Sequence, residues 1–252
     1  MQIILELAKN DIRKKIVGSY FGWFWLISKP IITIIVMWFV FSYGFKTPPV
    51  DGVDFFLWLS CGFVWWIFFS NTITDYTHSI VEYGYLLKQS KFNSIYILYF
   101  KFISNLTSLL LGSFILYVIY INNASVIYVS SLSFIYYIIS LSVFTFNLGV
   151  LLASLRVFFK DVSEVLNSIL QVLFWVTPII WNVSLIPINY HWVLFLNPLT
   201  YIVEGVRDTF IYNVMFYENL HYAAFFWIGN IFLYLISNYI YKRLSVKFND
   251  VL

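Results

Sequence analysis

Charged residues are scarce in this sequence: Asp, Glu, Lys and Arg together make up only 11% of its 252 residues. Soluble domains contain about 25% of these residue types. The hydrophobic residues reach 61%, and the mean hydropathy is +0.82. This composition excludes a water-soluble globular protein. We predict an all-helical (all-α) integral membrane protein in which residues 1–252 form a single transmembrane domain.

Other absences exclude further classes of protein. A single cysteine, Cys61, cannot form a disulfide framework within the chain. The net charge of +3 is too small to indicate a nucleic-acid partner. No phosphate-loop motif (Gly-x-x-x-x-Gly-Lys followed by Ser or Thr) occurs, so we expect no cofactor in this chain. His191 and His221 lack the spacing of metal ligands, and we expect no metal site.

Six apolar stretches are long enough to cross a bilayer as helices, which takes about 20 residues with a range of roughly 17–25. We predict these six spans at residues 28–45, 53–73, 94–121, 126–155, 165–181 and 222–241. Charged or turn-forming residues separate them, as in segment 156–164.

The basic residues predict how these spans are oriented. With the amino terminus inside, only Lys46 and Arg207 of the 15 Lys and Arg residues fall on the outer side. Such an excess marks the cytoplasmic side of a membrane protein. We therefore expect both termini in the cytoplasm. Lys29 and Lys101 lie just inside their spans, and we expect their long side chains to reach back to the lipid headgroups.

Residues 184–218, between the fifth and sixth predicted spans, pose a separate problem. A seventh span here would bury Glu204, Arg207 and Asp208 in the bilayer, at about 2.5–3.5 kcal/mol for each Asp or Arg. It would also move the last basic residues to the outer side. We expect instead a re-entrant or interfacial helical hairpin in the outer leaflet.

Local signals describe the second helix of this hairpin. Asn197 is predicted to cap the helix, and Pro198 is predicted to be its first residue. Glu204 then lies one turn from both Arg207 and Asp208, which predicts a local cluster of charges. The cluster is interpreted either as part of an outer gate or as an ordinary solvated pair on a surface helix.

The first 17 residues are too charged to span a membrane. One helical stripe is apolar and contains Ile4, Ala8, Ile12 and Ile16. The opposite stripe contains Gln2, Glu6, Lys9 and Arg13. We predict an amphipathic helix on the cytoplasmic surface, which serves either as an anchor or as a lever that receives force from a cytoplasmic partner. Tyr20, Trp23 and Trp25 follow at the interface, and Pro30 is predicted to begin the first span behind Ser28.

Three stretches together resemble one family, the permease subunits of ATP-binding-cassette (ABC) exporters that move lipid-linked polysaccharides such as O-antigen, capsule and teichoic acid. The first stretch is KKIVGSYFGWFWLISKP, which matches at Ser19, Gly22, Trp25 and Pro30. The second matches at Arg156, Lys160, Asp161, Leu170, Gln171, Phe174, Trp175, Thr177 and Pro178. The third matches at Asn197, Pro198, Leu199, Thr200, Glu204, Arg207 and Asp208. Val17, Lys29 and the Phe92-Asn93 pair depart from the family pattern.

The resemblance implies a type-2 exporter fold in the bacterial cytoplasmic (inner) membrane. It implies six spans, a second copy of the chain as partner, and a channel for a polymer. It also implies a separate cytoplasmic ATPase dimer that binds ATP and its magnesium ion, and it makes residues 184–218 the outer gate helices. The expected substrate is a polysaccharide on a polyprenyl-diphosphate carrier.

A channel for a sugar polymer needs aromatic faces and weak, repeated hydrogen bonds, because tight binding would stop transport. The fifth predicted span offers such residues at three- and four-residue steps, namely Asn167, Gln171, Trp175 and Pro178. The first span offers Trp38 and Ser42. The alternative for each aromatic is packing between helices or against lipid. Gln171 would be costly in lipid, which favours a channel or a dimer seam.

The remaining predictions concern the cytoplasmic side. Cations that could receive the carrier's diphosphate at the entrance are Arg13, Lys14, Lys15, Lys29 and Lys88. Residues that could contact the ATPase are Glu82, Lys88, Arg156, Lys160 and Asp161. For both sets the alternative is that the basic residues serve only the membrane topology.

Other functions stay open at this point. An ABC permease for drugs or other lipids would share the fold. A proton-coupled secondary transporter would need ionisable residues within the membrane, and only Asp75 and His78, three residues apart, suggest such a relay. A membrane-embedded transferase lacks support, because no cluster of acid and base residues is evident.

Overall fold

A computed structural model describes residues 2–16, 23–88, 92–122 and 131–252. Every regular element within these ranges is a helix, and none is a strand. The prediction of an all-helical protein is therefore confirmed for the described part of the chain.

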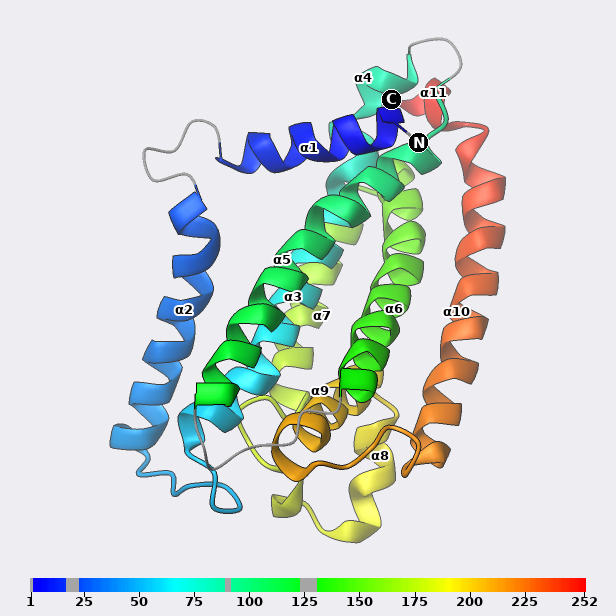
Figure 1. Ribbon diagram of the computed structural model, residues 1–252. Coiled ribbons are helices and arrows are strands. Elements are labelled where there is room, and N and C mark those ends of the chain that lie inside the picture. Colours follow the sequence, from blue (N-terminus) through cyan, green and yellow to red (C-terminus); the bar gives the residue numbers. More distant parts are fainter. Residues whose placement is uncertain (1, 17–22, 89–91, 123–130) are drawn as a thin grey trace.

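Four helices in the described ranges are long and apolar enough to cross a membrane. They are α3 (Phe55–Glu82), α5 (Ile95–Asn122), α6 (Ser131–Phe158) and α10 (Leu220–Ser245). Figure 1 shows them running side by side as a bundle. In their most apolar stretches, α3 has 72% of its residues buried and α10 only 22%. Helix α3 is thus the centre of the bundle and α10 lies at its edge.

Two further apolar helices are shorter, and six spans stay a prediction. Helix α2 (Trp23–Phe39) is continued by the five-residue π-helix η1 (Val40–Gly44), and α7 covers Val162–Val176. Pro30 was predicted to begin a span; α2 itself already begins at Trp23, and the apolar part of this helix runs from Pro30 to Gly44. Proline removes one backbone donor, and apolar residues on both sides continue the helix across this loss.

Helix α3 extends well beyond its predicted end at residue 73. Its start agrees with the prediction, since the Asp54 carboxylate accepts a hydrogen bond from the Phe56 amide at 2.7 Å and caps the helix. Its last turns contain Asp75, His78 and Glu82. Tyr76 and Ile80, which lie between these polar residues, are fully buried and hold the segment in the helix bundle.

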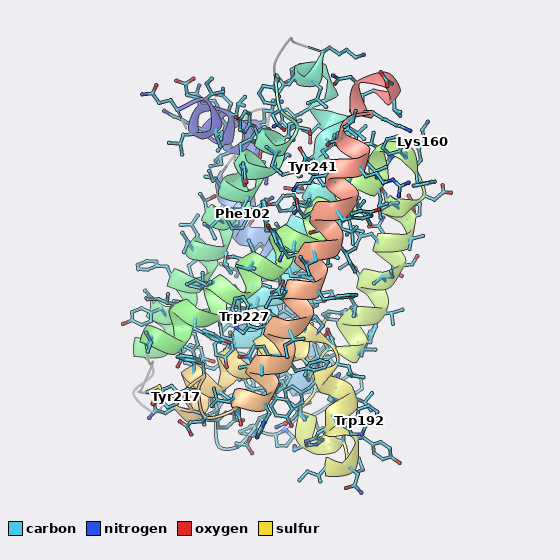
Figure 2. The ribbon with its side chains drawn as sticks, turned by 90° about the vertical axis from the view of Figure 1, so that its right-hand side faces the viewer. Phe102, Lys160, Trp192, Tyr217, Trp227 and Tyr241 are labelled. Carbon is cyan, nitrogen blue, oxygen red and sulfur yellow. The ribbon has the colours of Figure 1, made fainter. Side chains whose placement is uncertain are left out.

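The two ends of the bundle differ. Both termini lie at one end (Figure 1), together with α1 (Gln2–Ile16), α4 (Gly84–Leu87) and α11 (Phe248–Val251). We call this the α1 end. The opposite end, here the α9 end, holds the short helices η2 (Val183–Leu185), η3 (Ile188–Tyr190), α8 (His191–Phe195), α9 (Pro198–Arg207) and η4 (Asp208–Tyr212). Figure 2 shows Tyr241 and Lys160 toward the α1 end, and Trp192 and Tyr217 at the α9 end.

Candidate transport site

The exposed face of α7 holds three of the predicted channel residues. Asn167, Gln171 and Trp175 follow one another at four-residue steps, and all three are exposed, Trp175 to 64%. Residues at this spacing lie on one face of a helix. Amide side chains that face hydrocarbon without a hydrogen-bond partner are costly. The two amide side chains on this face therefore favour a polar environment over lipid.

An open groove of about 400 Å³ lies between α7 and α3. Its lining residues are Trp66 and Ser70 from α3 and Leu170, Gln171, Phe174 and Trp175 from α7. The rings of Trp66 and Phe174 lie 5.6 Å apart at their centroids. Sequence reasoning missed Trp66 and Ser70. Their four-residue spacing was a visible signal, but nothing in the sequence indicated that α3 and α7 are neighbours.

The other predicted channel residues lie elsewhere. Pro178 is buried, and its backbone carbonyl accepts a hydrogen bond from Arg207. Trp38 is half-buried and packs edge-on against Phe56, with 5.8 Å between ring centroids. Ser42 is half-buried in η1. The residues that line the groove do not include Trp38, Ser42 or Asn167.

At the α9 end, Arg207 is completely buried. Its guanidinium donates to the backbone carbonyls of Pro178 and Ile179, the latter at 2.7 Å, and to the Glu204 carboxylate at 2.6 Å. The carbonyls belong to the chain just beyond the end of α7, so Arg207 joins α9 to α7. The predicted Glu204–Arg207 pair is confirmed. The alternative of a solvated surface pair is wrong for Arg207, because a solvated guanidinium would not be enclosed by protein.

The other end of α9 is attached to the same segment. The side-chain oxygen (Oδ1) of Asn197 accepts a hydrogen bond from the Leu199 amide at 3.0 Å, and Pro198 is the first helical residue, as predicted. The Asn197 side-chain amide also donates to the Thr177 hydroxyl at 2.8 Å. Helix α9 is therefore bonded near both of its ends to residues 177–179 that follow α7.

Asp208 does not join this cluster. Within the described ranges its carboxylate has no salt-bridge partner, unlike Glu204. Burial, together with the nearby carboxylates of Glu204 and Glu218, raises the pKa of Asp208 to about 7, against the smaller lowering effect of Arg207. A partly buried carboxyl group at the α9 end thus titrates near neutral pH.

At the α1 end, Lys101 of α5 pairs with Asp11 of α1 at 3.0 Å, with their side chains 5% and 2% exposed. Lys101 was expected to reach the headgroups, which is wrong because Asp11 holds its ammonium group inside the protein. Ala8 is buried, as the predicted apolar stripe requires, but Asp11 is buried beside it. The burial of Asp11 was not predicted, because a lone acidic residue in an amphipathic helix is usually solvated.

The predicted entrance cations have different surroundings. Lys15 bonds to Asp75 at 2.8 Å and to Asn105 at 2.7 Å. Lys14 lies 4.5 Å from the centre of the Tyr83 ring. Arg13 and Lys88 are exposed. The side chains of Tyr20, Trp23, Trp25 and Lys29 lie outside the described residues.

The predicted ATPase-contacting residues all lie at the α1 end. Glu82 pairs with Lys101 at 3.2 Å and is otherwise exposed. Arg156 donates to the Ser163 hydroxyl at 2.6 Å across the turn between α6 and α7, where Lys160 and Asp161 are exposed. The turn and the α3–α4 junction therefore present charged groups at the same end of the bundle.

The proposed proton relay finds no support in these contacts. Asp75 bonds to Lys15 rather than to His78, and His78 is exposed. No group of three or more His, Cys, Asp or Glu residues in the described ranges is arranged to hold a metal ion.

The comparison with known families decides the class. The sequence model of the ABC-2 type transporters matches residues 3–211, which include α1, the groove and all of α9. The chain belongs to the ABC-2 type transporter family. The resemblance inferred from the three sequence stretches is thereby confirmed.

Individual ABC-2 relatives are distant in sequence. The chain is 23% identical over 255 aligned positions to the O-antigen export system permease protein RfbA of Klebsiella pneumoniae, and the alignment covers 99% of this chain and 95% of that protein. It is 21% identical to the protein of the same name in Myxococcus xanthus, over 86% of this chain and 81% of that protein. This ABC-2 chain is thus a multi-pass membrane transport subunit.

Proposed function

We propose that this chain is the permease subunit of an ATP-driven exporter that moves a lipid-linked polysaccharide across the bacterial cytoplasmic membrane. Two copies would form the channel, and a separate ATPase dimer would supply the energy. The observation that carries the proposal is the exposed face of α7, where Gln171 and Trp175 border a groove instead of packing inside the chain. The names of the relatives, which are O-antigen export permeases, support the class of substrate.

The chemistry of this face suits a sugar polymer. An indole ring offers an apolar surface to a sugar ring, and the Gln171 amide and Ser70 hydroxyl offer hydrogen bonds of moderate strength. None of the described residues that line the groove is charged, so a polymer would meet no strong ionic site among them. A conducting path requires such weak and repeated contacts.

The proposed orientation in the membrane rests on the exposed basic residues at the two ends of the helix bundle. The α1 end holds exposed Arg13, Lys88 and Lys160, whereas of the two basic residues near the α9 end Arg207 is enclosed by protein and Lys46 is exposed. The excess of accessible basic residues supports a cytoplasmic location for the α1 end. Residues 184–218 would then form the outer gate, and Glu82, Lys88, Arg156, Lys160 and Asp161 would face the ATPase.

The channel face is tested by export. We expect that changing both Gln171→Leu and Trp175→Leu lowers ATP-dependent polymer export about tenfold or more in cells that also produce the ATPase. The matched control is Val172→Leu, an exposed apolar position on the same helix. Full export by the double variant would refute the channel face. Vesicle assays with labelled drugs or short lipids separate the alternative ABC substrates from a polysaccharide.

The orientation is tested by labelling. Tyr190→Cys and Asn213→Cys put thiols at exposed positions of the α9 end, and Asp250→Cys puts one at the α1 end. The native Cys61 is buried and should give little background. A membrane-impermeant maleimide should label the first two in intact cells and the third only after permeabilisation. The reverse pattern would invert the proposed direction of transport.

A further inference from the structure

Both members of the ion pair between Asp11 and Lys101 have further polar partners inside the protein. Besides Lys101, the Asp11 carboxylate accepts hydrogen bonds from the Tyr83 hydroxyl at 2.7 Å and the Ser104 hydroxyl at 2.6 Å. Lys101 has a second anionic partner in Glu82 at 3.2 Å. A buried ion pair is tolerated only when further hydrogen bonds of this kind compensate its desolvation, and losing one partner leaves a buried charge. Lys101 offsets the effect of burial on Asp11, and with Ser104 and Tyr83 it keeps the pKa of Asp11 below its ordinary value.

The partners of this pair come from three separate elements. Asp11 lies on α1, Lys101 and Ser104 lie on α5, and Glu82 is the last residue of α3. Tyr83 is the next residue and lies between α3 and α4, where it caps the end of one helix and the start of the other. The cluster thus fastens the amino-terminal helix to the point where α3 passes into the short helix α4.

The apolar packing of α1 against the bundle involves only part of its apolar side chains. Among the α1 side chains that the structure describes, Ala8 is the only apolar one that is fully buried; Ile4 and Leu7 are partly buried, and Ile3 and Leu5 are exposed. The second polar link, from Lys15 to Asp75 and Asn105, is partly exposed and therefore weaker. Among the ion pairs that the described residues of α1 make, the Asp11–Lys101 pair is thus the more deeply buried one.

We propose that Asp11 and Lys101 are positioning residues that join α1 and the α3–α4 junction into one rigid lever at the cytoplasmic end. This inference rests on the proposed function, in which an ATPase acts on that end of the permease. Both α1 and α4 then move together, and force applied to either one reaches α5 through Lys101. Neither residue needs to touch the ATPase or the polymer for this role.

The joint itself is tested on the permease without its ATPase. Spin labels at Lys9→Cys and Tyr85→Cys, both exposed, report the distance between α1 and α4 in reconstituted protein. We expect a narrow distance distribution in the otherwise unmodified chain and a clearly broader one after Asp11→Asn. The control Asp250→Asn, at an exposed position of the same end, should leave it narrow. A distribution that Asp11→Asn leaves unchanged would overturn the joint.

The lever is tested on the complex with its ATPase by the amount of polymer exported per ATP hydrolysed. A coupling of ordinary strength predicts that Lys101→Met lowers this ratio about tenfold while ATP hydrolysis continues. Lys101→Arg keeps the charge and should retain most of the polymer exported per ATP. The exposed control Lys242→Met should leave this ratio unchanged. A normal ratio in Lys101→Met would overturn the lever. If the unmodified complex exports no polymer with ATP, the proposed function fails instead, and the label distances still decide whether the joint exists.

Discussion

The guanidinium of Arg207 lies 3.5 Å from the centre of the Trp58 ring, so a residue of α9 is stacked on the central helix α3. The same guanidinium is bonded to the chain after α7. Cation–π stacking and charge-assisted hydrogen bonds thus meet on one fully buried side chain. Arg207 connects α3, α7 and α9 at the α9 end, and most of the predictions below concern this region.

Removing the charge of Arg207 should destabilise the protein strongly. Arg207→Met leaves the carbonyls of Pro178 and Ile179 without their donor and Glu204 without its partner, and losses of this kind amount to about 3–5 kcal/mol. Arg207→Lys should lose less, because it keeps the charge. Thermal unfolding in detergent measures both. A melting temperature of Arg207→Met equal to that of the unmodified protein would show that the stacked and bonded arrangement contributes nothing.

Glycine is required where α9 meets α6. A Cβ atom on Gly205 would overlap the ring of Tyr137, so Gly205→Ala should destabilise the fold by about 1–3 kcal/mol. Gly229 in α10 has open space around it, and Gly229→Ala should stabilise that helix by up to about 1 kcal/mol. Unfolding experiments on both variants under the same conditions should show stability changes of opposite sign. Equal effects at both positions would contradict the close contact.

The raised pKa of Asp208 predicts a pH-dependent stability. Its pKa is higher in the folded protein than in the unfolded chain, so the folded state loses stability as the pH rises from about 4 to about 7, and the loss is complete above that range. Asp208→Asn should remove this loss, and we expect a gain of about 2 kcal/mol above pH 7 that shrinks toward pH 4. Unfolding curves of both proteins across this range check the sign. A difference that is independent of pH would contradict it.

A hydrogen bond inside the bundle joins α10 to α6. The side-chain amide of Asn147 donates to the Asn230 carbonyl oxygen at 3.0 Å, and both side chains are buried. Asn230→Leu should lower the free energy of unfolding by about 1–2 kcal/mol, because it leaves Asn147 unpaired among apolar helices. The double change of both residues to Leu should cost less than the single change. A double variant that loses as much as the sum of two singles would refute the pairing.

Length and apolarity located most of the membrane helices, because crossing a bilayer is a local requirement on one segment. The predicted spans 94–121 and 222–241 differ from α5 and α10 by only a few residues. The prediction failed at the far end of α3, where neighbouring helices bury Tyr76 and Ile80 beyond the predicted end of the span. The cap of α9 was predictable for the same reason as the spans, since Asn197 and Pro198 act on the adjacent turn.

By itself, the sequence determined that this is a helical membrane transport subunit of the ABC-2 family, because composition, span length and motif spacing are properties of the chain alone. Only the tertiary structure decided the surroundings of its polar residues. Asp11 and Lys101 are far apart in sequence, as are Arg207 and Ile179, and each pair is compensated inside the protein by groups that folding brings together. A charge can be buried only where such partners surround it, and that arrangement is a property of the packed helices.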